Sequence, residues 1–377
     1  MTPVAPGRLR AAALPVAVLV LVAIAAWPSA RALPDPRPNV IVVLTDDQRW
    51  DSLEAMPWLS RQLERQDSGW ASFPLAVANS PLCCPARAAL LTGRFPRHTG
   101  VLRNEDGARL DESRTIATWL HDAGYRTGIV GKYLNRYPFG RLPYVPQGWD
   151  RAVIKPNEGD VTVYRDFDVV DQGSPVHVTG GYSTDWLAGR AVSFVRSAPA
   201  ERPFFLLFAP SAPHPPWVPA DRHVGTAAAR AFPEAPTVAG ALRGAPAWVE
   251  ALPIPSAAQR AVWIDERRRA SETLAAVDDA LRAIVTALED RLDDTVIVVL
   301  SDQGYSFGEH RWAGKRCPYE SCVRIPLVVH VPGEDVEPVD GPVSTVDIAP
   351  TILELTGTAP VPGVDGTSFA GRLRGAA

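Results

Sequence analysis

Cysteine, net positive charge and long apolar runs are all scarce in this sequence. Its 377 residues include four cysteines, too few for a small scaffold held together by disulfides. The formal net charge of −4 argues against a general nucleic-acid binder, because such proteins present an excess of basic side chains. No internal repeat is present, and beyond residue 27 no stretch is long and apolar enough for a transmembrane helix. What remains is an ordinary globular composition with 46% hydrophobic residues, ample for a large core.

The one long apolar run lies at the N-terminus and has the features of a secretory signal. Two arginines precede an apolar run over 11–27, and Ala30-Arg31-Ala32 resembles a cleavage site. We therefore expect 1–32 to be a signal peptide or an uncut N-terminal anchor, since about 17 apolar residues is the lower limit for crossing a bilayer. A Pro-rich linker over 33–38 then leads to a single domain at 39–377. Either outcome predicts a secreted or cell-envelope protein.

Short apolar, β-branched segments alternate along the chain with segments of helical periodicity. The apolar segments are continuous, which is typical of strands buried on both faces of a parallel sheet. The alternation predicts an α/β fold with a mostly parallel central sheet and helices on both faces. The expected strands are 39–44, 126–130, 203–208, 295–300 and 325–331. The expected helices are 56–66, 85–92, 115–123, 185–197 and, as the last, 346–355, and the segment 256–290 fits one long helix or two consecutive ones.

Two segments rich in proline and glycine show little periodicity. We expect 137–182 to run as loops over the sheet edge, and 221–255 to be a surface insertion near the active face. Neither segment is expected to form a separate domain.

Two adjacent cysteines open the segment that we expect to be reactive. Pro85 suits the first position of a helix and Gly93 suits its C-cap. Cys83 would then lie just ahead of a helix N-terminus, where unpaired backbone N–H groups favour an anionic substrate. Cys83 and Cys84 could be a redox pair, a metal site or a thiol nucleophile, and this segment alone leaves the three alternatives open.

Oxygen-bearing side chains directly follow two of the expected strands. Asp46 and Asp47 follow the strand at 39–44, and Asp302 and Gln303 follow the strand at 295–300. Open α/β sheets form their sites at the carboxyl edge, so these positions suit a site. Three carboxylates and one amide are hard ligands, which favour Ca²⁺ or Mg²⁺ over zinc. The simpler alternative is a solvated turn.

Basic side chains follow other strands. Lys132 follows the strand at 126–130, and His214 and Lys315 also lie just past strand ends, His214 in a rigid proline-rich loop. Arg87 lies one helical turn beyond Cys83. Taken singly, a lysine at a strand end is more often a solvated charge than a ligand. One divalent ion, three fixed cations and a histidine around one nucleophile together predict a site for an anionic ester.

These motifs resemble those of the sulfatase family over roughly residues 38–370. The segment 83–93 matches the family signature, in which cysteine, any residue, proline, serine or alanine, and arginine precede leucine-threonine-glycine. The resemblance implies an alkaline-phosphatase-like fold and hydrolysis of sulfuric esters. Six further matches stand in family order: Leu44-Thr45-Asp46-Asp47, Gly131-Lys132, Ala212-Pro213-His214, Ser301-Asp302-Gln303-Gly304, Gly308-Glu309-His310 and Gly314-Lys315.

The resemblance also implies roles for single residues. In the family a separate maturation enzyme oxidises the cysteine to formylglycine, so Cys83 is the implied nucleophile and Cys84 the variable position. Asp302 would accept the proton of the nucleophile, and His214, with Lys315, would protonate the leaving group. The implied catalytic residues are Cys83, Arg87, Lys132, His214 and Lys315, and the implied ligands of Ca²⁺ or Mg²⁺ are Asp46, Asp47, Cys83, Asp302 and Gln303.

Within the family, the adjacent cysteines and the segment 131–135 resemble the branch of N-acetylglucosamine-6-sulfatases, which implies a sulfated, glucosamine-containing glycan as substrate. Three features depart from the family pattern. Leu134 stands where many sulfatases have histidine, Gln303 stands where asparagine is frequent, and the chain ends soon after Leu373. We therefore expect the small C-terminal sheet domain of larger sulfatases to be reduced or missing.

Two other functions compete with this interpretation. One is a phosphate or phosphonate monoester hydrolase of the same fold. The other is a non-catalytic glycan-binding relative in which Cys83 is never modified.

Several further residues are weaker candidates. Cys317 and Cys322 could form a small-loop disulfide, which their spacing alone does not settle. Glu320 and Arg324 are expected to form a structural pair, while Glu309 and His310 could support the site or stabilise a turn, and His98 is a weaker candidate still.

Overall fold

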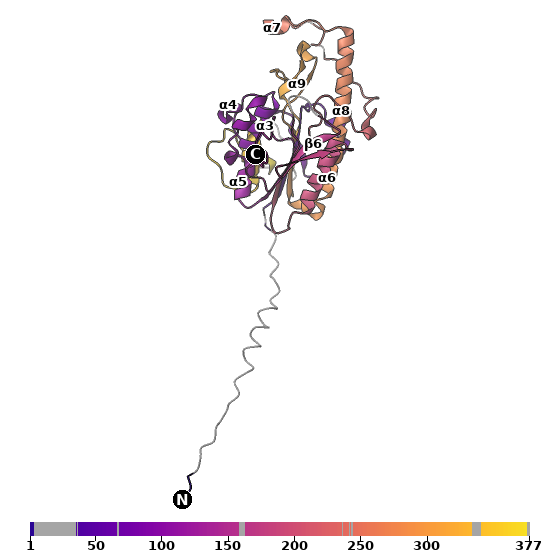
Figure 1. The fold of residues 1–377 in the computed structure, drawn as a ribbon. Coiled ribbons are helices and arrows are strands. Elements are labelled where there is room, and N and C mark those ends of the chain that lie inside the picture. The colour runs from indigo at the N-terminus through magenta and orange to yellow at the C-terminus, as the bar shows by residue number, and fades with distance from the viewer. Residues whose placement is uncertain are drawn as a thin grey trace. The chain divides into compact units, whose positions relative to one another are not determined.

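A nine-stranded sheet forms the centre of the computed structural model (Figure 1). The structure describes residues 1–3, 35, 37–65, 68–157, 163–235, 237–240, 242, 244–333 and 341–374. The expected signal peptide or anchor, beyond residue 3, and most of the expected linker lie outside the described residues. Residues 35–377 form one compact unit.

Five parallel strands occupy the middle of the sheet, and two antiparallel strands extend it at each edge. The strand order is β2-β12-β9-β1-β8-β4-β5-β6-β7, and the five neighbouring strands β9, β1, β8, β4 and β5 are parallel. The strands are β1 (Asn39–Thr45), β2 (Trp70–Ser72), β4 (Arg126–Gly131), β5 (Arg151–Ile154), β6 (Phe167–Asp171), β7 (Ser174–Val178), β8 (Phe204–Ala209), β9 (Thr295–Ser301) and β12 (Leu327–His330). Two small ladders pair β3 (Ala76–Val77) with β13 (Val343–Ser344) and β10 (Ser306–Phe307) with β11 (Ala313–Gly314).

Helices cover both faces of the sheet, with α3 and α5 on one side and α6 and α8 on the other (Figure 1). The α-helices are α2 (Pro57–Glu64), α3 (Cys83–Thr92), α4 (Pro96–Thr99), α5 (Ile116–Asp122), α6 (Ser183–Arg196), α7 (Ala247–Glu250), α8 (Ala257–Thr286), α9 (Glu320–Val323), α10 (Thr345–Leu355) and α11 (Ala370–Leu373). Short 3₁₀ helices are η1 (Leu53–Ala55), η2 (Asn104–Arg109), η3 (Glu112–Arg114), η4 (Asp221–His223), η5 (Glu289–Asp294) and η6 (Glu309–Arg311).

The continuous apolar runs form strands because both of their faces are buried. In β1, Val40 and Val42 pack in the core beneath α3, α5 and α10, while Ile41 and Val43 pack in the core beneath α2, α6 and α8. All seven residues of β1 are buried. The predicted α/β fold with a mostly parallel sheet therefore follows from two hydrophobic cores that share one sheet.

Helix α3 differs in its start from the sequence-based expectation. It begins at Cys83, so Pro85 is its third residue and not its first. All ten residues of α3 are buried. Gly93 ends the helix with a φ of 63°, as predicted, because a left-handed C-cap favours a residue without Cβ.

The expectation that 137–182 consists of loops was wrong. This segment contains β5, β6 and β7, which extend the sheet, and Gln172 and Gly173 join β6 to β7 with positive φ at both positions, as tight hairpins require. Helix α10 is also not the last helix, since α11 follows it. The other predicted strands and helices are present to within a few residues, and the segment at 256–290 contains the single helix α8.

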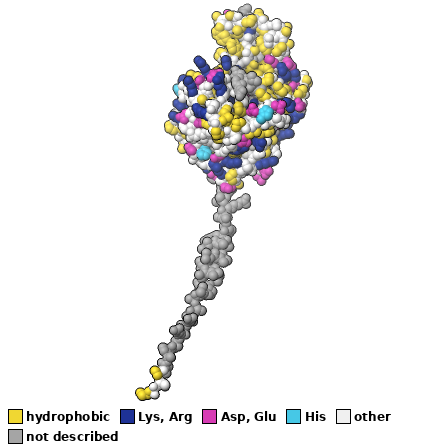
Figure 2. All heavy atoms as spheres, viewed as in Figure 1, with side chains coloured by type: hydrophobic (Ala, Val, Ile, Leu, Met, Phe, Trp, Pro, Cys, Tyr) yellow, Lys and Arg dark blue, Asp and Glu magenta, His cyan; other side chains and the backbone are white. Residues whose placement is uncertain are grey.

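The insertion at 221–255 lies next to the projecting end of α8 (Figure 1). Among its described residues the structure places only η4 and α7. Exposed apolar side chains gather at this end of the molecule (Figure 2), and they include Trp248, Ile254, Val262 and Ile264. Within the described ranges, no helix combines the length and the apolarity needed to cross a bilayer.

Candidate active site

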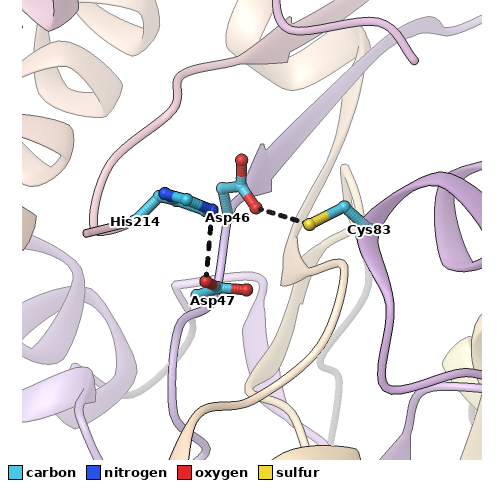
Figure 3. Close-up of side chains that lie close together, drawn as sticks. All are labelled: Asp46, Asp47, Cys83 and His214. Carbon is cyan, nitrogen blue, oxygen red and sulfur yellow. Dashed lines mark hydrogen bonds and ion pairs between the residues drawn. The ribbon is translucent and has the colours of Figure 1, made fainter. Parts of the chain in front are cut away.

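The side chains proposed from the sequence come together at the carboxyl edge of the parallel strands. The edge is formed by neighbouring strands whose ends are in register, with Thr45 opposite Ser301 and Gly131 opposite Ala209. Helix α3 adds its first turn to the same edge, and Figure 3 shows four of the side chains facing one another. The contributions are Asp46 and Asp47 after β1, Lys132 after β4, His214 after β8, Asp302 and Gln303 after β9, Lys315 after β11, and Cys83 and Arg87 from α3.

The sulfur of Cys83 lies at the centre of this group. Its Sγ is 3.1 Å from Lys315 Nζ, 3.2 Å from Gln303 Nε2 and 3.4 Å from Asp46 Oδ1. The side chain is fully buried. Cys83 therefore contacts an acid, a base and an amide that approach from two different strands and one loop.

The environment keeps Cys83 protonated as a free thiol. Burial, followed by the charge of Asp46, raises its pKa to about 11, although Lys132 and Lys315 oppose this shift. A thiolate is the nucleophilic form of cysteine, so this position does not suit a thiol nucleophile at neutral pH. The neighbouring Cys84 is also a free thiol, packs in the hydrophobic core and has a pKa raised by burial to about 12. Two buried thiols with raised pKa values are poorly suited to form a reactive redox pair.

Each buried carboxylate of the site lies beside a buried cation. Lys132 Nζ is 2.5 Å from Asp46 Oδ2, and Lys315 Nζ is 3.1 Å from Asp47 Oδ2. Burial alone would raise the pKa of Asp46, but Lys132, then His214 and Arg87, hold it well below its usual range. The same contacts hold the pKa of both lysines above the usual value against the effect of burial.

Arg87 connects the helix to two strand ends. Its Nε donates to Asp302 Oδ2 at 2.8 Å, and its Nη1 donates to the backbone oxygen of Lys132 at 2.8 Å. The pKa of Asp302 is nevertheless raised, first by burial and then by the negative charge of Asp46. Arg87 thus holds the Asp302 carboxylate and the backbone of Lys132 together.

His214, in its neutral form, accepts a hydrogen bond from Lys315. Its Nδ1 is 2.8 Å from the carbonyl oxygen of Pro215, which can only accept, so the proton lies on Nδ1. Its Nε2 is 3.1 Å from Lys315 Nζ, which can only donate. Burial lowers the pKa of His214, while Asp47 and Asp46 oppose the shift. The acidic proton of this pair therefore lies on Lys315.

The described residues include a buried group that could hold a divalent cation. Asp46, Asp47, Cys83 and His214 each offer one ligand atom, and these atoms lie within 4.8 Å of one another. The Gln303 amide donates to Asp47 and leaves its Oε1 buried without a partner, as a cation-binding oxygen would be. Both oxygens of Asp302 already have partners, namely Arg87 and the backbone N–H of Asp47. Two carboxylates and an orphaned amide oxygen fit a hard cation.

The weaker candidates lie in structural contacts. Glu309 forms an ion pair with Arg49 at 2.8 Å, and His98 Nδ1 lies within hydrogen-bond distance of Asp365 Oδ2, at 2.7 Å, on the surface. His310 stacks on Tyr319 with the ring centroids 3.8 Å apart. Two expectations are met: Arg324 lies 3.2 Å from Glu320, and Cys317 and Cys322 form a disulfide two residues beyond Lys315.

Sequence reasoning missed residues that act through backbone atoms. Tyr164 donates its hydroxyl to the carbonyl oxygen of His214 at 2.6 Å, and Asn104 accepts from the backbone N–H of Cys84 at 3.1 Å. Gly131 has a φ of 119°, and a Cβ there would lie 2.0 Å from the carbonyl oxygen of Ala209. The Gly131-Lys132 dipeptide could have indicated this role, whereas the bonds of Tyr164 and Asn104 leave no sequence signal.

Comparison with known proteins agrees with the motifs and with this geometry. A sequence model described as Sulfatase matches residues 38–358, which is most of the chain. The chain belongs to the sulfatase family. Its α/β architecture, expected from the sequence, is confirmed by solved sulfatase structures of the same fold.

Curated sulfatases are similar over nearly the whole chain. An extracellular sulfatase SULF-1 homolog of Drosophila melanogaster is 31% identical over 354 residues, which are 88% of this chain and 31% of that protein. The Volvox carteri arylsulfatase is 30% identical over 93% of this chain and 61% of that protein. The human N-acetylglucosamine-6-sulfatase is 29% identical over 100% of this chain and 73% of that protein. The chain thus spans from about a third to about three quarters of the length of these relatives.

Solved structures extend the similarity to three dimensions. The protein BT4656, solved in complex with its substrate D-glucosamine-2-N,6-O-disulfate, has a TM-score of 0.77 and 26% identity, and the match covers 90% of this chain and 80% of that one. A phosphonate monoester hydrolase of Agrobacterium radiobacter has a TM-score of 0.69 and 23% identity over 90% of this chain and 77% of that one. The second likeness shows a shared fold alone.

Proposed function

We propose that this sulfatase-family chain hydrolyses sulfate monoesters, with formylglycine derived from Cys83 as the nucleophile. The observation that supports this most is the position of Cys83 in the first turn of α3, with Lys315 Nζ 3.1 Å from its sulfur. A thiol with a pKa of about 11 is poorly suited to attack, whereas its replacement by an aldehyde would put a new functional group among the same cations. The implied partner is a formylglycine-generating maturation enzyme.

The chain's own residues neutralise and orient the ester. A sulfate monoester is an anion, so a nucleophile reaches it only where cations offset the charge. Lys132 is held beside Asp46 and has further N–H donors for sulfate oxygens. Lys315 is held beside Asp47 and His214, and the N–H that it directs at position 83 is the one that a sulfate oxygen bound there would accept. Asp302, whose pKa is raised by burial and by Asp46, is the proposed acceptor of the proton of the nucleophile.

A divalent cation, Ca²⁺ or Mg²⁺, completes the proposal. Asp46, Asp47 and Gln303 would hold it, with the residue at position 83 and Asp302 as the remaining ligands predicted from the sequence. The cation would supply positive charge that polarises the ester. In the structure Lys132 and Lys315 already compensate the two carboxylates, which keeps the oxygen atoms close together without repulsion.

The leaving alcohol receives its proton from the Lys315–His214 pair. Because His214 Nδ1 donates to Pro215, its Nε2 faces Lys315 with a lone pair and fixes that ammonium group in the site. An alkoxide leaves slowly unless it is protonated, so a fixed acid at this point speeds the step. Lys315 thus donates the proton, and His214 is the residue that positions it and can share it.

A sulfated, glucosamine-containing glycan is the proposed substrate. The human relative is named N-acetylglucosamine-6-sulfatase, and BT4656 was solved with a disulfated glucosamine. The proposed location is outside the cytoplasm, based on the sequence of residues 1–32.

The test combines the mass of the Cys83 peptide with kinetics. Protein matured in its native host should carry formylglycine at position 83 and should hydrolyse N-acetylglucosamine-6-sulfate and an aryl sulfate. Cys83→Ala should abolish turnover, whereas the matched Cys84→Ala should retain it, because Cys84 lies in the hydrophobic core. A higher kcat/KM on the corresponding phosphate ester would favour the phosphate hydrolase instead. An intact thiol at Cys83 in the mature protein, without turnover, would identify the non-catalytic glycan-binding alternative.

A further inference from the structure

Lysine is rare in this chain and is confined to one edge of the sheet. Only three of the 38 basic residues are lysine, and the others are arginine. Lys132 follows β4, Lys315 follows β11, and Lys155 follows β5. Lys132 and Lys155 are 1% and 2% exposed, and the Lys315 side chain is 12% exposed. Arginine therefore supplies the positive charge of the surface, and lysine occurs only at and beside the candidate active site.

Lys155 lies directly beside Lys132 in the sheet. Strands β4 and β5 are parallel, Gly131 is opposite Ile154, and the backbone N–H of Lys155 donates to the oxygen of Gly131 at 2.9 Å. Neighbouring strands are about 4.8 Å apart. Because β5 follows β4 in the order β9-β1-β8-β4-β5, Lys155 extends the row of strand-end residues away from Asp302 and Asp46.

Lys155 differs from the other two lysines because the described residues include no counter-ion for it. Lys132 pairs with Asp46 and Lys315 with Asp47, but Lys155 makes no side-chain hydrogen bond or ion pair within the part of the chain that the structure describes. Burial, and next the charge of Lys132, lower the pKa of Lys155 to about 8, so it remains mostly protonated at neutral pH. A buried, unpaired ammonium group is unfavourable unless a ligand completes it.

Other buried polar atoms near these strand ends also lack partners. Both side-chain polar atoms of Asn157, two residues beyond Lys155, are buried and make no hydrogen bond. Asn135 Oδ1, after β4, and Ser211 Oγ, after β8, are unpartnered as well. These four residues follow three consecutive strands, β8, β4 and β5, in the sheet. Unsatisfied groups in a row are typical of a site that a polar ligand fills.

The position of Lys155 distinguishes it from the residues around the ester. In the sheet, β4 lies between β8 and β5, so Lys132 after β4 stands between Asp46 after β1 and Lys155 after β5. Lys132 Nζ is 2.5 Å from Asp46 Oδ2, and Asp46 Oδ1 is 3.4 Å from the sulfur of Cys83. Lys132 thus lies between the reactive position and Lys155. A substrate that extends from Cys83 past Lys132 would reach Lys155 with its next substituent.

We propose that Lys155 and Asn157 form a second anion-binding subsite, which takes a sulfamate or carboxylate group carried by the same substrate beside the ester that is cleaved. The ammonium group would pair with the anion, and the Asn157 amide N–H would donate to a second oxygen of it. This inference rests on the proposed function for the identity of the substrate. Its geometric basis, the unpaired side chains, is independent of turnover.

Binding tests the subsite without any chemistry. In full-length Cys83→Ala protein, calorimetry would compare three ligands: N-acetylglucosamine-6-sulfate with one anion, N-sulfoglucosamine-6-sulfate with two, and a disaccharide that joins a uronate to N-acetylglucosamine-6-sulfate. Adding Lys155→Met to this protein should raise the Kd of a ligand with the second anion about tenfold to a hundredfold more than it raises the Kd of N-acetylglucosamine-6-sulfate. This is the size of effect expected for the loss of one charged hydrogen bond. The affected ligand identifies the second anion as sulfamate or carboxylate. Arg282 is exposed, and Arg282→Met is the matched control, which should leave the Kd of all three ligands unchanged.

An equal effect of Lys155→Met on all three ligands, or no effect, would overturn the subsite. Asn157→Ala in the same assay should also weaken binding of the ligand with the second anion more than binding of N-acetylglucosamine-6-sulfate. This variant keeps the proposal testable if Lys155→Met does not fold. Lys155→Met should not lower Tm, since it removes an unpaired buried charge, whereas a structural lysine would destabilise the fold when removed. If the wild-type enzyme hydrolyses no sulfate ester, the proposed function fails, while the binding ratios still decide the subsite.

Discussion

Charges alternate in sign around Cys83, and this pattern decides what a single substitution does. Asp46 contacts Lys132, Asp47 contacts Lys315, and Arg87 contacts Asp302, and all of these side chains are buried except that of Lys315, which is 12% exposed. Removal of one member leaves its partner buried without compensation, which costs more than the pair contributes. Substitutions in the site are therefore expected to change stability and activity together, and each requires both measurements.

Lys132→Met should lower kcat/KM on an aryl sulfate by on the order of a hundredfold or more, the usual effect of removing one preorganised charge. It should also lower the free energy of unfolding by roughly 3–5 kcal/mol, because Asp46 loses its counter-ion. Steady-state kinetics and chemical denaturation measure the two effects. Arg136→Met, four residues along in an exposed pair with Glu105, should change stability by less than about 1 kcal/mol and leave kcat/KM unaltered. Full activity of the Lys132 variant would falsify its proposed role.

At the scale of single elements, the end of β4 depends on a residue without a side chain. The carbonyl oxygen of Ala209 accepts from the backbone N–H of Lys132 at 2.7 Å, and a Cβ on Gly131 would lie 2.0 Å from that same oxygen. Gly131→Ala should therefore move the end of β4 away from β8 and carry Lys132 with it. We expect a loss of roughly 3 kcal/mol or more in unfolding free energy together with a large fall in kcat. Wild-type stability in a thermal melt would contradict this.

Strand β12 contains a histidine that makes stability depend on pH. His330 is buried, and its Nδ1 donates to the Thr295 oxygen at 3.0 Å. Burial lowers its pKa, so the unfolded chain binds the proton more readily, and stability falls as pH drops below the ordinary value of about 6.5. His330→Gln should reduce the loss of Tm between about pH 7.5 and about pH 5.5. Equal losses in both proteins would refute this assignment.

The elements also show what could be predicted from the sequence. Strands β1, β4, β8 and β9 were identified because both faces are buried and their apolar runs are continuous. Strand β7 is mostly exposed and contains Pro175, so it has no such run, and the short β5 and β6 lie in the same segment. Since β5 was not expected, Lys155 at its end was not expected either. Six of the nine site residues proposed from the sequence follow predicted strands, and Cys83 and Arg87 belong to the predicted helix α3. Lys315 follows the two-residue strand β11, which was not predicted.

Across the whole molecule, two hydrophobic cores share one sheet, and a ligand at its edge would stabilise both. A cation bound by Asp46, Asp47 and Gln303 would join β1 to β9. Ligand at a hundredfold excess over Kd stabilises a native state by about 2.7 kcal/mol.

Addition of Ca²⁺ to chelator-treated protein should therefore raise Tm in a saturable way, as measured by scanning calorimetry. Asp47→Asn should abolish this response, while Asp365→Asn, which removes a carboxylate that pairs with His98 on the surface, should retain it. A Tm that does not depend on Ca²⁺ or Mg²⁺ would exclude this binding site.

The confinement of lysine to the site has a practical consequence for chemical labelling. Reagents that acylate amines need a neutral amine, and arginine stays protonated at any working pH. Apart from the α-amino group, such a reagent therefore finds only Lys132, Lys155 and Lys315 in the entire chain. Among these three, Lys155 should react first, because its pKa is lowered to about 8 whereas ion pairs raise the pKa of Lys132 and Lys315. Acylation of Lys155 followed by peptide mass analysis would therefore monitor occupancy of the subsite in the unsubstituted enzyme, because a bound glycan should protect this amine while the arginine-coated surface gives no signal.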